Sequence, residues 1–366
     1  MTRFVALINA GNIRSGGGLQ VASSFLSICL ERRTDLFYVI SPELFVKFRD
    51  VLPFGSYTVS DERAGSIFGK YQRSKIIKAI TTRLEIEIVF SIFGPEIIVG
   101  PVRHYQGFAL PWVIYDTSSS RASLGTLRYL LVKFTAWVQR VLFKFNTSAI
   151  ICETTDAAQR ASKLLKVRAE VVSNNAAQNF HDHQFSKKSF DESAGLQLFY
   201  PSFPHPHKNH QFLFNALQHI ESQVVVFVTL PPESPLLANA PPQVVNLGIL
   251  DQQGLLSAYE ICDAVVSVSS LECFSALIPE AFTAGKPLLL PRLPFFEDVA
   301  GKGAIYFEPN SVSDFGFAIE KLNHLLAKES EPDLSNILNK QKQLLEDFDS
   351  PEVRYQKYLR IIQSAR

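Results

Sequence analysis

The sequence is poor in several residues that mark specialised classes of protein. It has one Met and two Trp in 366 residues, and its four cysteines are scattered, with no CxxC pair. Cysteines without such spacing predict neither a zinc site nor a disulfide framework, and they suit a reducing compartment. Lysine and arginine number 36 against 35 acids. This balance gives no overall attraction to nucleic acid, so we expect no nucleic-acid partner.

Long apolar runs are missing as well. No stretch reaches the roughly 18 apolar residues of a spanning helix, and the N-terminus MTRFVALINAGN lacks the apolar core and cleavage site of a signal peptide. We therefore expect a cytoplasmic protein. The nearest approach to a membrane segment is 126–146, which Arg128, Lys133, Arg140 and Lys144 interrupt. It predicts a basic amphipathic helix, either a half-buried core helix whose charged heads reach water or a helix in contact with a membrane.

Short apolar runs alternate with longer helical stretches along the whole chain. Uncharged strands between helices are typical of parallel sheets covered on both faces, and 366 residues suit two domains. We therefore predict an α/β fold of two doubly wound, Rossmann-like domains, with a ligand in the cleft between them at the carboxyl ends of the strands. The expected strands lie at 3–9, 36–41, 86–93, 112–116, 148–154, 169–174, 196–202, 224–230, 243–250, 264–269, 287–291 and 304–309.

A polar segment without periodicity lies near mid-chain and sets the domain boundaries. The N-terminal domain is expected at 1–178, the linker at 179–195 and the C-terminal domain at 196–350. Ser350 before Pro351 is a plausible start for a last helix at 351–366.

Two acids stand out in the almost uncharged stretch SSLECFSALIPEAFTAGKPLLLP, residues 269–291. Glu272 follows a predicted strand, and Glu280 lies in the first turn of a helix that Pro279 opens and Gly285 ends. The amides at the start of that helix favour an anion such as a diphosphate. Carboxylates beside an anion site are explained if they accept hydrogen bonds from sugar hydroxyls. The plainer alternative is that Glu280 complements the helix dipole and Glu272 is a solvated acid.

This stretch resembles the E-x7-E signature of retaining GT-B glycosyltransferases, particularly glycosyltransferase family 4. The preceding LGILDQQGLLSAYEICDAVVSVSS and the following AIYFEPNSVSDFGFAIEKL are similar to the flanks that this family usually has, so the resemblance covers about 196–325. It implies a GT-B fold in which the helix at 351–366 returns to the N-terminal domain. It also implies that Glu272 touches the donor sugar and that Glu280 holds the nucleotide ribose.

The resemblance assigns the backbone amides between the two acids to the sugar and phosphate of the donor. These donor-binding residues are Phe274, Ser275, Ala276 and Leu277. The family usually has Gly where Ser275 stands.

Three further segments resemble parts of the same family. FYPSFPHPHKNHQFLFNAL, residues 199–217, is similar to its phosphate-binding segment, in which Lys208 matches a catalytic Lys; the plainer alternative is a surface lysine. The usual partner Arg has no clear counterpart, and His205 and His207 are candidates to replace it. The glycine-rich turn with Gly16, Gly17 and Gly18 resembles a loop that faces the donor phosphates, though it is also explained as a flexible turn. His104 resembles a His near the reacting sugar, with a structural histidine as the alternative.

The resemblance implies a metal-independent, retaining hexosyltransferase without a cofactor. Its donor would be a nucleoside-diphosphate sugar and its acceptor a saccharide or lipid-linked saccharide, in bacterial surface polysaccharide synthesis (O-antigen of lipopolysaccharide, or capsule). Lys70, Arg73, Lys75 and Lys78, with 126–146, suggest contact with an anionic membrane, so a peripheral position on the inner face of the cytoplasmic membrane stays open. Two alternatives also stay open: a degenerate nucleotide-sugar-binding protein without turnover and a GT-B-like epimerase.

Overall fold

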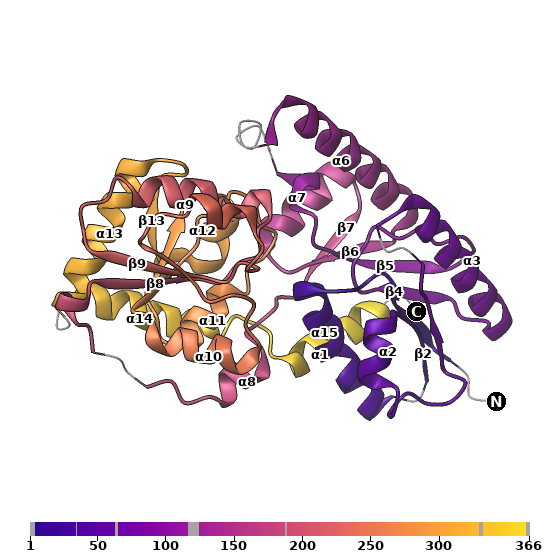
Figure 1. The fold of residues 1–366 in the computed structure, drawn as a ribbon. Coiled ribbons are helices and arrows are strands. Elements are labelled where there is room, and N and C mark those ends of the chain that lie inside the picture. Colours follow the sequence, from indigo (N-terminus) through magenta and orange to yellow (C-terminus); the bar gives the residue numbers. More distant parts are fainter. Residues whose placement is uncertain are drawn as a thin grey trace. The chain divides into compact units, whose positions relative to one another are not determined.

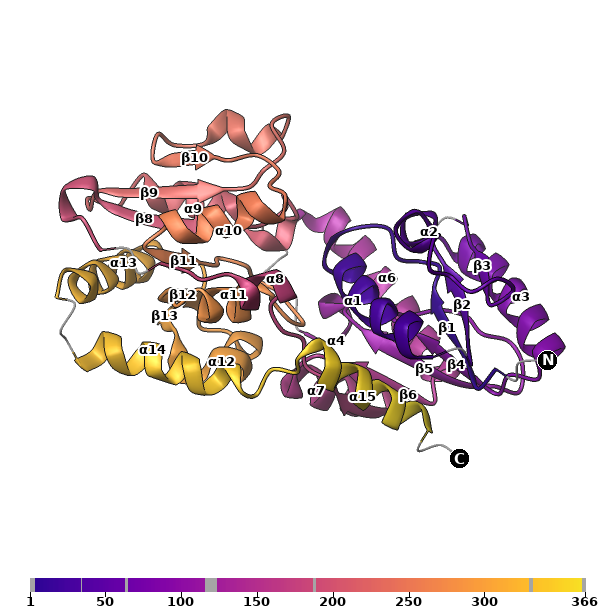
Figure 2. The same ribbon diagram turned by 90° about the horizontal axis from the view of Figure 1, so that it is seen from below.

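The computed structural model describes residues 4–33, 35–62, 65–115, 124–186, 189–328 and 332–363. The chain forms two compact units. The first holds residues up to Tyr115, Leu130–Asn174 and the residues from Asp349 on, and the second holds Asn175–Phe348 with the first turn of a long helix at 126–146. Each unit contains one parallel sheet with helices on both faces (Figures 1 and 2). The predicted doubly wound α/β architecture is confirmed.

The first unit is built on a seven-stranded parallel sheet. In spatial order its strands are β3 (Tyr57–Val59), β2 (Leu36–Ile40), β1 (Ala6–Ala10), β4 (Ile88–Ser91), β5 (Arg103–Phe108), β6 (Ala149–Cys152) and β7 (Arg168–Val171). One face is covered by α1 (Gly16–Arg32), α2 (Pro42–Phe48) and α15 (Pro351–Gln363), and the other by α3 (Ile67–Leu84), α6 (Thr126–Asn146) and α7 (Thr155–Leu165) (Figure 1). The strand order reverses between β1 and β4, and loops at such a switch point are where doubly wound sheets bind ligands.

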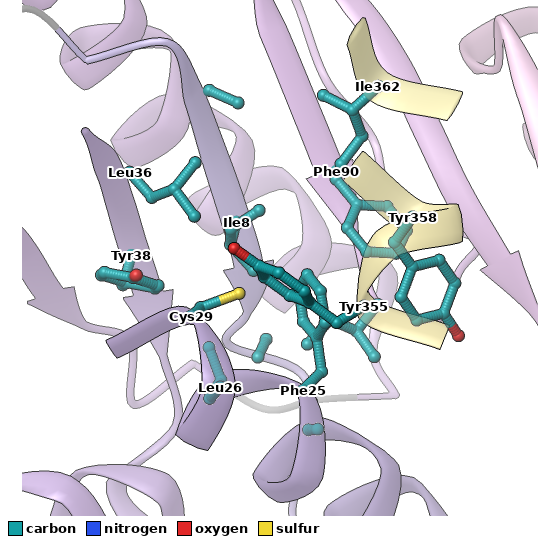
Figure 3. Close-up of a cluster of buried hydrophobic side chains, with 14 of the residues drawn as sticks. Ile8, Phe25, Leu26, Cys29, Leu36, Tyr38, Phe90, Tyr355, Tyr358 and Ile362 are labelled. Atoms are coloured by element: carbon teal, nitrogen blue, oxygen red, sulfur yellow. The ribbon is translucent and has the colours of Figure 1, made fainter. Parts of the chain in front are cut away.

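The helix α15 completes the core of this unit. Its Tyr358 ring lies 5.2 Å from Phe25 of α1 and 5.1 Å from Phe90 of β4, measured between ring centroids. Figure 3 shows Tyr355, Tyr358 and Ile362 among the apolar side chains of α1 and the sheet. The Ser350 hydroxyl accepts a 3.3 Å hydrogen bond from the Val353 amide, which caps the helix start. The last helix of the chain therefore belongs to the unit that the first residues build.

The second unit is built on a six-stranded parallel sheet. In spatial order its strands are β10 (Val244–Asn246), β9 (Val224–Val228), β8 (Leu196–Tyr200), β11 (Ala264–Val266), β12 (Leu288–Pro291) and β13 (Ile305–Phe307). The order reverses between β8 and β11, so the loops after these two strands form the switch point. The helices are α8 (Gln178–Asp182), α9 (His210–Leu217), α10 (Gln252–Ile261), α11 (Leu277–Thr283), α12 (Pro294–Ala300), α13 (Val312–Ala327) and α14 (Pro332–Leu345), with 3-10 turns η2 (Glu192–Ala194), η3 (Pro206–Lys208), η4 (Pro235–Asn239) and η5 (Gly301–Gly303).

One expected strand is a helical turn, so that prediction is wrong. In the described part of 112–116 the chain forms α4 (Pro111–Ile114), because Pro111 suits the first position of a helix. The strand of this region is β5, whose polar residues conceal it from a search for apolar runs. Gly107 of β5 lies so close to the backbone that a Cβ would stand 1.9 Å from the Ile92 carbonyl oxygen.

Candidate nucleotide-sugar site

Lys208 and Glu272 meet at the switch point of the second unit. Lys208 ends the turn η3 after β8, and Glu272 lies in the loop after β11, the neighbouring strand. The Lys208 ammonium donates a hydrogen bond to Glu272 Oε1, and the two side chains are 20% and 10% exposed. The sequence separates these residues by 64 positions. The structure therefore brings together one cation and one carboxylate that were predicted from separate motifs.

Serine hydroxyls fix this pair in place. Ser269 Oγ lies 2.8 Å from Glu272 Oε1 and 3.0 Å from the His207 carbonyl oxygen. The amide of Ser270 donates to the same carbonyl at 2.8 Å, and the Tyr200 hydroxyl donates to the Lys208 carbonyl at 2.6 Å. Both loops are thus held by bonds that do not use the Lys208 ammonium or the second oxygen of Glu272.

The sequence did not single out Ser269, because 264–269 was expected to be strand. In the structure β11 ends at Val266, so the serines from Ser267 on belong to the loop. Three serines within the five residues before Glu272 (Ser267, Ser269 and Ser270), at the end of a buried strand, were the available signal. Hydroxyl groups in a loop that follows a strand can bond backbone and ligand alike.

His207, directly before Lys208, is not a replacement cation of equal strength. Burial lowers the pKa of His207 to about 4, with the nearby Lys208 and His205 acting in the same direction and Glu272 opposing them. The His207 imidazole is therefore neutral at pH 7. Its ring stacks on that of His205, with centroids 5.6 Å apart and an angle of 8° between the planes. His207 can supply a hydrogen bond to a phosphate, but Lys208 supplies the charge.

Glu280 lies in a different environment from Glu272. Its Oε2 accepts a 2.9 Å hydrogen bond from the hydroxyl of Tyr259 on α10. Burial raises the pKa of Glu280 to about 7, and the bond from Tyr259 offsets only part of this rise. Tyr259 is a partner that the sequence analysis missed. A buried carboxyl with a pKa near neutrality can change its charge when a ligand arrives, and such groups gather at functional sites.

The backbone between the two acids partly agrees with the prediction. The helix α11 begins at Leu277 rather than at Pro279, and Gly285 follows its end with a φ of +64°. The amides of Ile278 and Glu280 are used by the carbonyls of Ser275 and Ala276. Two of the amides that were expected to point free are therefore occupied within the turn.

The amides just before them remain available. Within the described chain those of Phe274 and Ser275 donate no backbone hydrogen bond. Ser275 is 9% exposed and Leu277 6%, whereas Phe274 and Ala276 are half-buried. The Phe274 ring lies edge-on to Phe348, with centroids 6.3 Å apart. The amides of Phe274 and Ser275 therefore lie in a packed segment and, among the described residues, are not used by a backbone carbonyl.

A cavity of about 450 Å³ lies beside the histidine loop in the second unit. Its walls include Pro206, Pro231, His210 and Ser234. In the described residues, His210 Nδ1 and Ser234 Oγ are buried without a hydrogen-bond partner. Buried polar atoms are usually satisfied by protein or water, so this cavity has capacity for further hydrogen bonds next to the Lys208 loop.

Gly16, Gly17 and Gly18 open α1 directly after β1, at the switch point of the first unit. Gly16 has a φ of +66°, a conformation that favours glycine. A Cβ on Gly16 or Gly17 would meet no atom within 4 Å, and on Gly18 it would lie 3.6 Å from the Phe93 ring. Gly17 and Gly18 are therefore not required by contacts inside the described chain, which leaves room for a ligand against this backbone.

His104 does not lie at either switch point. It is the second residue of β5 and therefore near the amino end of that strand, whereas ligands bind at the carboxyl ends. It is 3% exposed, and its Nε2 lies 2.8 Å from Ser91 Oγ, which also accepts from Asn9 Nδ2 at 3.0 Å. This geometry supports the alternative of a structural histidine, so we leave His104 out of the proposed catalytic group.

The four basic residues of α3 that suggested contact with an anionic membrane differ in exposure. Arg73 is fully buried and donates two hydrogen bonds of 2.9 Å to Glu96, which Lys70 also contacts at 3.3 Å. Lys75 and Lys78 are exposed. Only part of this cluster can therefore meet a partner.

Among the described residues, no helix is long and apolar enough to cross a membrane. Within the same ranges, no group of three or more His, Cys, Asp or Glu side chains is arranged to hold a metal ion.

Comparison with known proteins gives matches in structure only. No protein-family model and no curated protein matches the sequence. A glycosyltransferase from Rickettsia africae superposes with a TM-score of 0.69 at 12% identity, covering 100% of this chain and 99% of that one. Sucrose-phosphate synthase from Thermosynechococcus elongatus gives 0.68 at 12%, covering 99% of each chain. Anabaena HepE, solved with UDP and glucose, gives 0.66 at 12%, covering 99% and 100%.

These structures match both units of the chain over almost its whole length. At 12% sequence identity, this likeness shows a shared fold and nothing further. Together with the seven- and six-stranded parallel sheets, they establish that the chain has the GT-B fold of its glycosyltransferase neighbours.

Proposed function

We propose that this chain is a metal-independent glycosyltransferase that moves a hexose from a nucleoside-diphosphate sugar to a saccharide or lipid-linked saccharide, with retention of configuration. The observation that carries the proposal is the pairing of Lys208 with Glu272 at the switch point between β8 and β11. An ammonium and a carboxylate side by side suit a ligand that has a phosphate next to sugar hydroxyls.

The two acids are proposed to contact different parts of the donor. Glu272, close to Lys208, contacts the sugar hydroxyls while Lys208 contacts the diphosphate, and the unused amides of Phe274 and Ser275 add donors to the same anion. The ribose hydroxyls donate hydrogen bonds to the carboxylate oxygen of Glu280 that does not accept one from Tyr259. The glycine turn Gly16–Gly18 of the first unit is proposed to contribute to the phosphate site, in line with the family that the sequence resembles.

The chemistry requires charge to be stabilised on the leaving group. As the bond between the anomeric carbon and the diphosphate breaks, negative charge grows on the phosphate oxygen, and fixed donors there lower the barrier. The acceptor hydroxyl oxygen forms the new bond to the anomeric carbon, and its proton passes to the departing phosphate. No enzymic base is needed in this scheme, which agrees with leaving His104 out.

The Lys208 ammonium has three N–H donors, so it can bind a diphosphate oxygen while it still donates to Glu272, or turn from Glu272 to the diphosphate. Its hydrogen bond to Glu272 holds both side chains beside the proposed phosphate position. Because Ser269 also contacts Glu272 Oε1, the carboxylate keeps a partner when Lys208 turns away.

The acceptor and its setting follow from the family resemblance alone. We propose a role in bacterial surface polysaccharide synthesis, such as O-antigen or capsule, at the cytoplasmic side of a membrane. Anionic lipid is the proposed membrane partner, and no nucleic acid or cofactor is assigned.

The test is to incubate the purified chain with a panel of nucleoside-diphosphate sugars and to measure both thermal stabilisation and release of free nucleoside diphosphate. We expect one donor to raise the melting temperature and to be hydrolysed slowly without acceptor. Stabilisation without release, with or without added saccharides, would instead favour the degenerate binding protein. Ser275 in place of Gly and the lack of a second cation, the usual Arg, beside Lys208 are specific grounds for that alternative. No stabilisation by any member of the panel would contradict the proposal.

A further inference from the structure

The helix α6 carries a row of large apolar side chains on its outer surface. Six of them are between 57% and 75% exposed: Leu127, Leu130, Leu131, Phe134, Trp137 and Phe145. Their spacing of three and four residues puts them on one face of the helix. The rings of Phe134 and Trp137 lie nearly parallel, with centroids 6.0 Å apart. We call this row the α6 stripe.

The α6 stripe is not the face that holds the helix on the first unit. The buried residues of α6 are Ala136 and Phe143, which lie on the opposite side, with Phe143 5.1 Å from the ring of Phe108. Arg140 donates to the Val113 carbonyl oxygen at 2.8 Å, so this charged group is held by the protein rather than by water. The alternative of a core helix with charged heads in water therefore does not describe the outer face. A surface helix is normally polar on its outer side.

Charge in the two long helices of this face is one-sided. α3 and α6 together contain nine Lys and Arg and no Asp or Glu, which leaves 27 bases against 35 acids in the rest of the chain. Both helices cover the same face of the seven-stranded sheet (Figure 1). Exposed Lys75, Lys78 and Lys144 lie on them, and α3 also exposes Ile67 and Phe68. Exposed apolar side chains among basic residues, in helices that contain no acidic residue, suit a partner surface that is both apolar and negatively charged.

A second copy of the chain fits this face less well. An interface between two identical faces would bring the exposed bases of one copy against those of the other, and like charges brought together oppose association. These exposed bases are Lys75, Lys78, Arg83, Arg128 and Lys144. Anionic lipid headgroups would complement the same charges, and the acyl boundary below them would cover the α6 stripe.

We propose that α6 lies in the plane of an anionic bilayer surface, with the α6 stripe inserted among the lipid headgroups. Insertion of apolar side chains provides the larger share of the attraction, and the bases of α3 and α6 add a preference for anionic lipid. This assigns to α6 the contact with anionic lipid that is part of the proposed function, and the assignment holds whether or not the chain transfers sugar.

The experiment uses the full chain and vesicles of phosphatidylcholine with and without 30% phosphatidylglycerol. In a Trp112→Phe background, Trp137 is the single tryptophan, which is excited selectively at wavelengths that tyrosine does not absorb. We expect its emission to shift to shorter wavelength on adding anionic vesicles and to be quenched by lipids brominated near the headgroup. Cosedimentation should show the same binding, about tenfold weaker with neutral vesicles and partly reversed by salt.

Two sets of variants decide the question. Leu130→Ser with Phe134→Ser should weaken vesicle binding at least tenfold, while Phe317→Ser should not, although Phe317 on α13 is 65% exposed. Circular dichroism and melting temperature should be unchanged, because the replaced side chains are on the surface. Equal binding by the double variant, or no binding by the parent chain, would overturn the proposal. A dimer that the double variant abolishes, without vesicle binding, would assign the face to a protein partner and would overturn it too.

Discussion

The hydroxyl of Tyr259 donates a 2.9 Å hydrogen bond to Glu280 Oε2 inside the second unit. Glu280 is buried, and its pKa is raised to about 7 from the ordinary 4.5. The folded chain therefore keeps a proton on this carboxyl at pH values where the unfolded chain has lost it. Both stability and ligand binding should then depend on pH through Glu280.

Replacement of Glu280 by Gln should change the pH dependence of stability. Because the pKa of Glu280 is raised by folding, this group lowers the free energy of unfolding as the pH rises from about 4.5 to about 7, by up to about 3 kcal/mol in all. Glu280→Gln should remove that loss, so the variant gains on the parent chain across this window. Urea titrations at pH 5 and pH 8 give the difference. His207 and His210, whose pKa values are lowered to about 4, are present in both proteins and cancel. An equal difference at both pH values would contradict the prediction.

Glu280→Gln should also weaken binding of the bare nucleoside diphosphate. Loss of a charged acceptor for the ribose hydroxyls costs roughly 1.5 to 3 kcal/mol. Since ribose binding favours the ionised carboxylate, the parent chain should release a proton near pH 7 when the nucleotide binds. Calorimetry in two buffers of different ionisation enthalpy measures this release, and the variant controls for protons from the phosphates. Identical proton release by both proteins would argue that Glu280 is not the ribose acceptor.

Glu272→Gln should separate sugar transfer from nucleotide binding. Affinity for the nucleoside diphosphate should stay equal or become tighter, because Lys208 no longer donates to a competing carboxylate. Turnover of the complete donor should fall by one to two orders of magnitude, as the contact to the sugar is made in the transition state. Lys208→Met is the matched comparison and should weaken the nucleotide as well. Unchanged turnover in Glu272→Gln would remove the main support for the proposed function.

His104→Ala should destabilise the first unit and leave catalysis intact. The substitution leaves the Ser91 hydroxyl in a buried position without its 2.8 Å partner, which costs about 1 to 3 kcal/mol. Denaturant unfolding measures the loss, and initial rates at a temperature where the variant is folded measure the activity. A folded variant with turnover reduced a hundredfold would return His104 to the catalytic group.

The sequence allowed the fold to be predicted wherever the strands are apolar. The apolar runs 36–41 and 196–202 match β2 and β8. A strand that is covered on both faces contains almost only apolar residues, so it is visible in the sequence. β5 was not predicted, because it contains the polar residues His104 and Gln106. Both are buried in the core, where each makes a side-chain hydrogen bond. A search for apolar runs detects only whether a residue is polar. It does not detect the hydrogen-bond partner that allows a polar side chain to be buried.

The candidate site was likewise predictable only in the parts that are visible in the local sequence. The segment 269–287 and Lys208 stand out because their spacing is local and visible in the sequence. Their pairing depends on β8 lying next to β11, which only the strand order provides. Tyr259 could not be found from the sequence, because nothing near α10 marks its hydroxyl as the partner of an acid 21 positions away.

The return of α15 to the first unit has a consequence for synthesis on the ribosome. Residues 175–348 form one continuous stretch that emerges and can fold while translation proceeds. The first unit lacks Tyr355, Tyr358 and Ile362 of its core until the codons for α15 have been read. Its seven strands are all complete by Val171, but Phe25 and Phe90 remain without their contacts to α15 for the whole time needed to make the second unit. Nascent chains stalled before α15 are the ones that should need a chaperone.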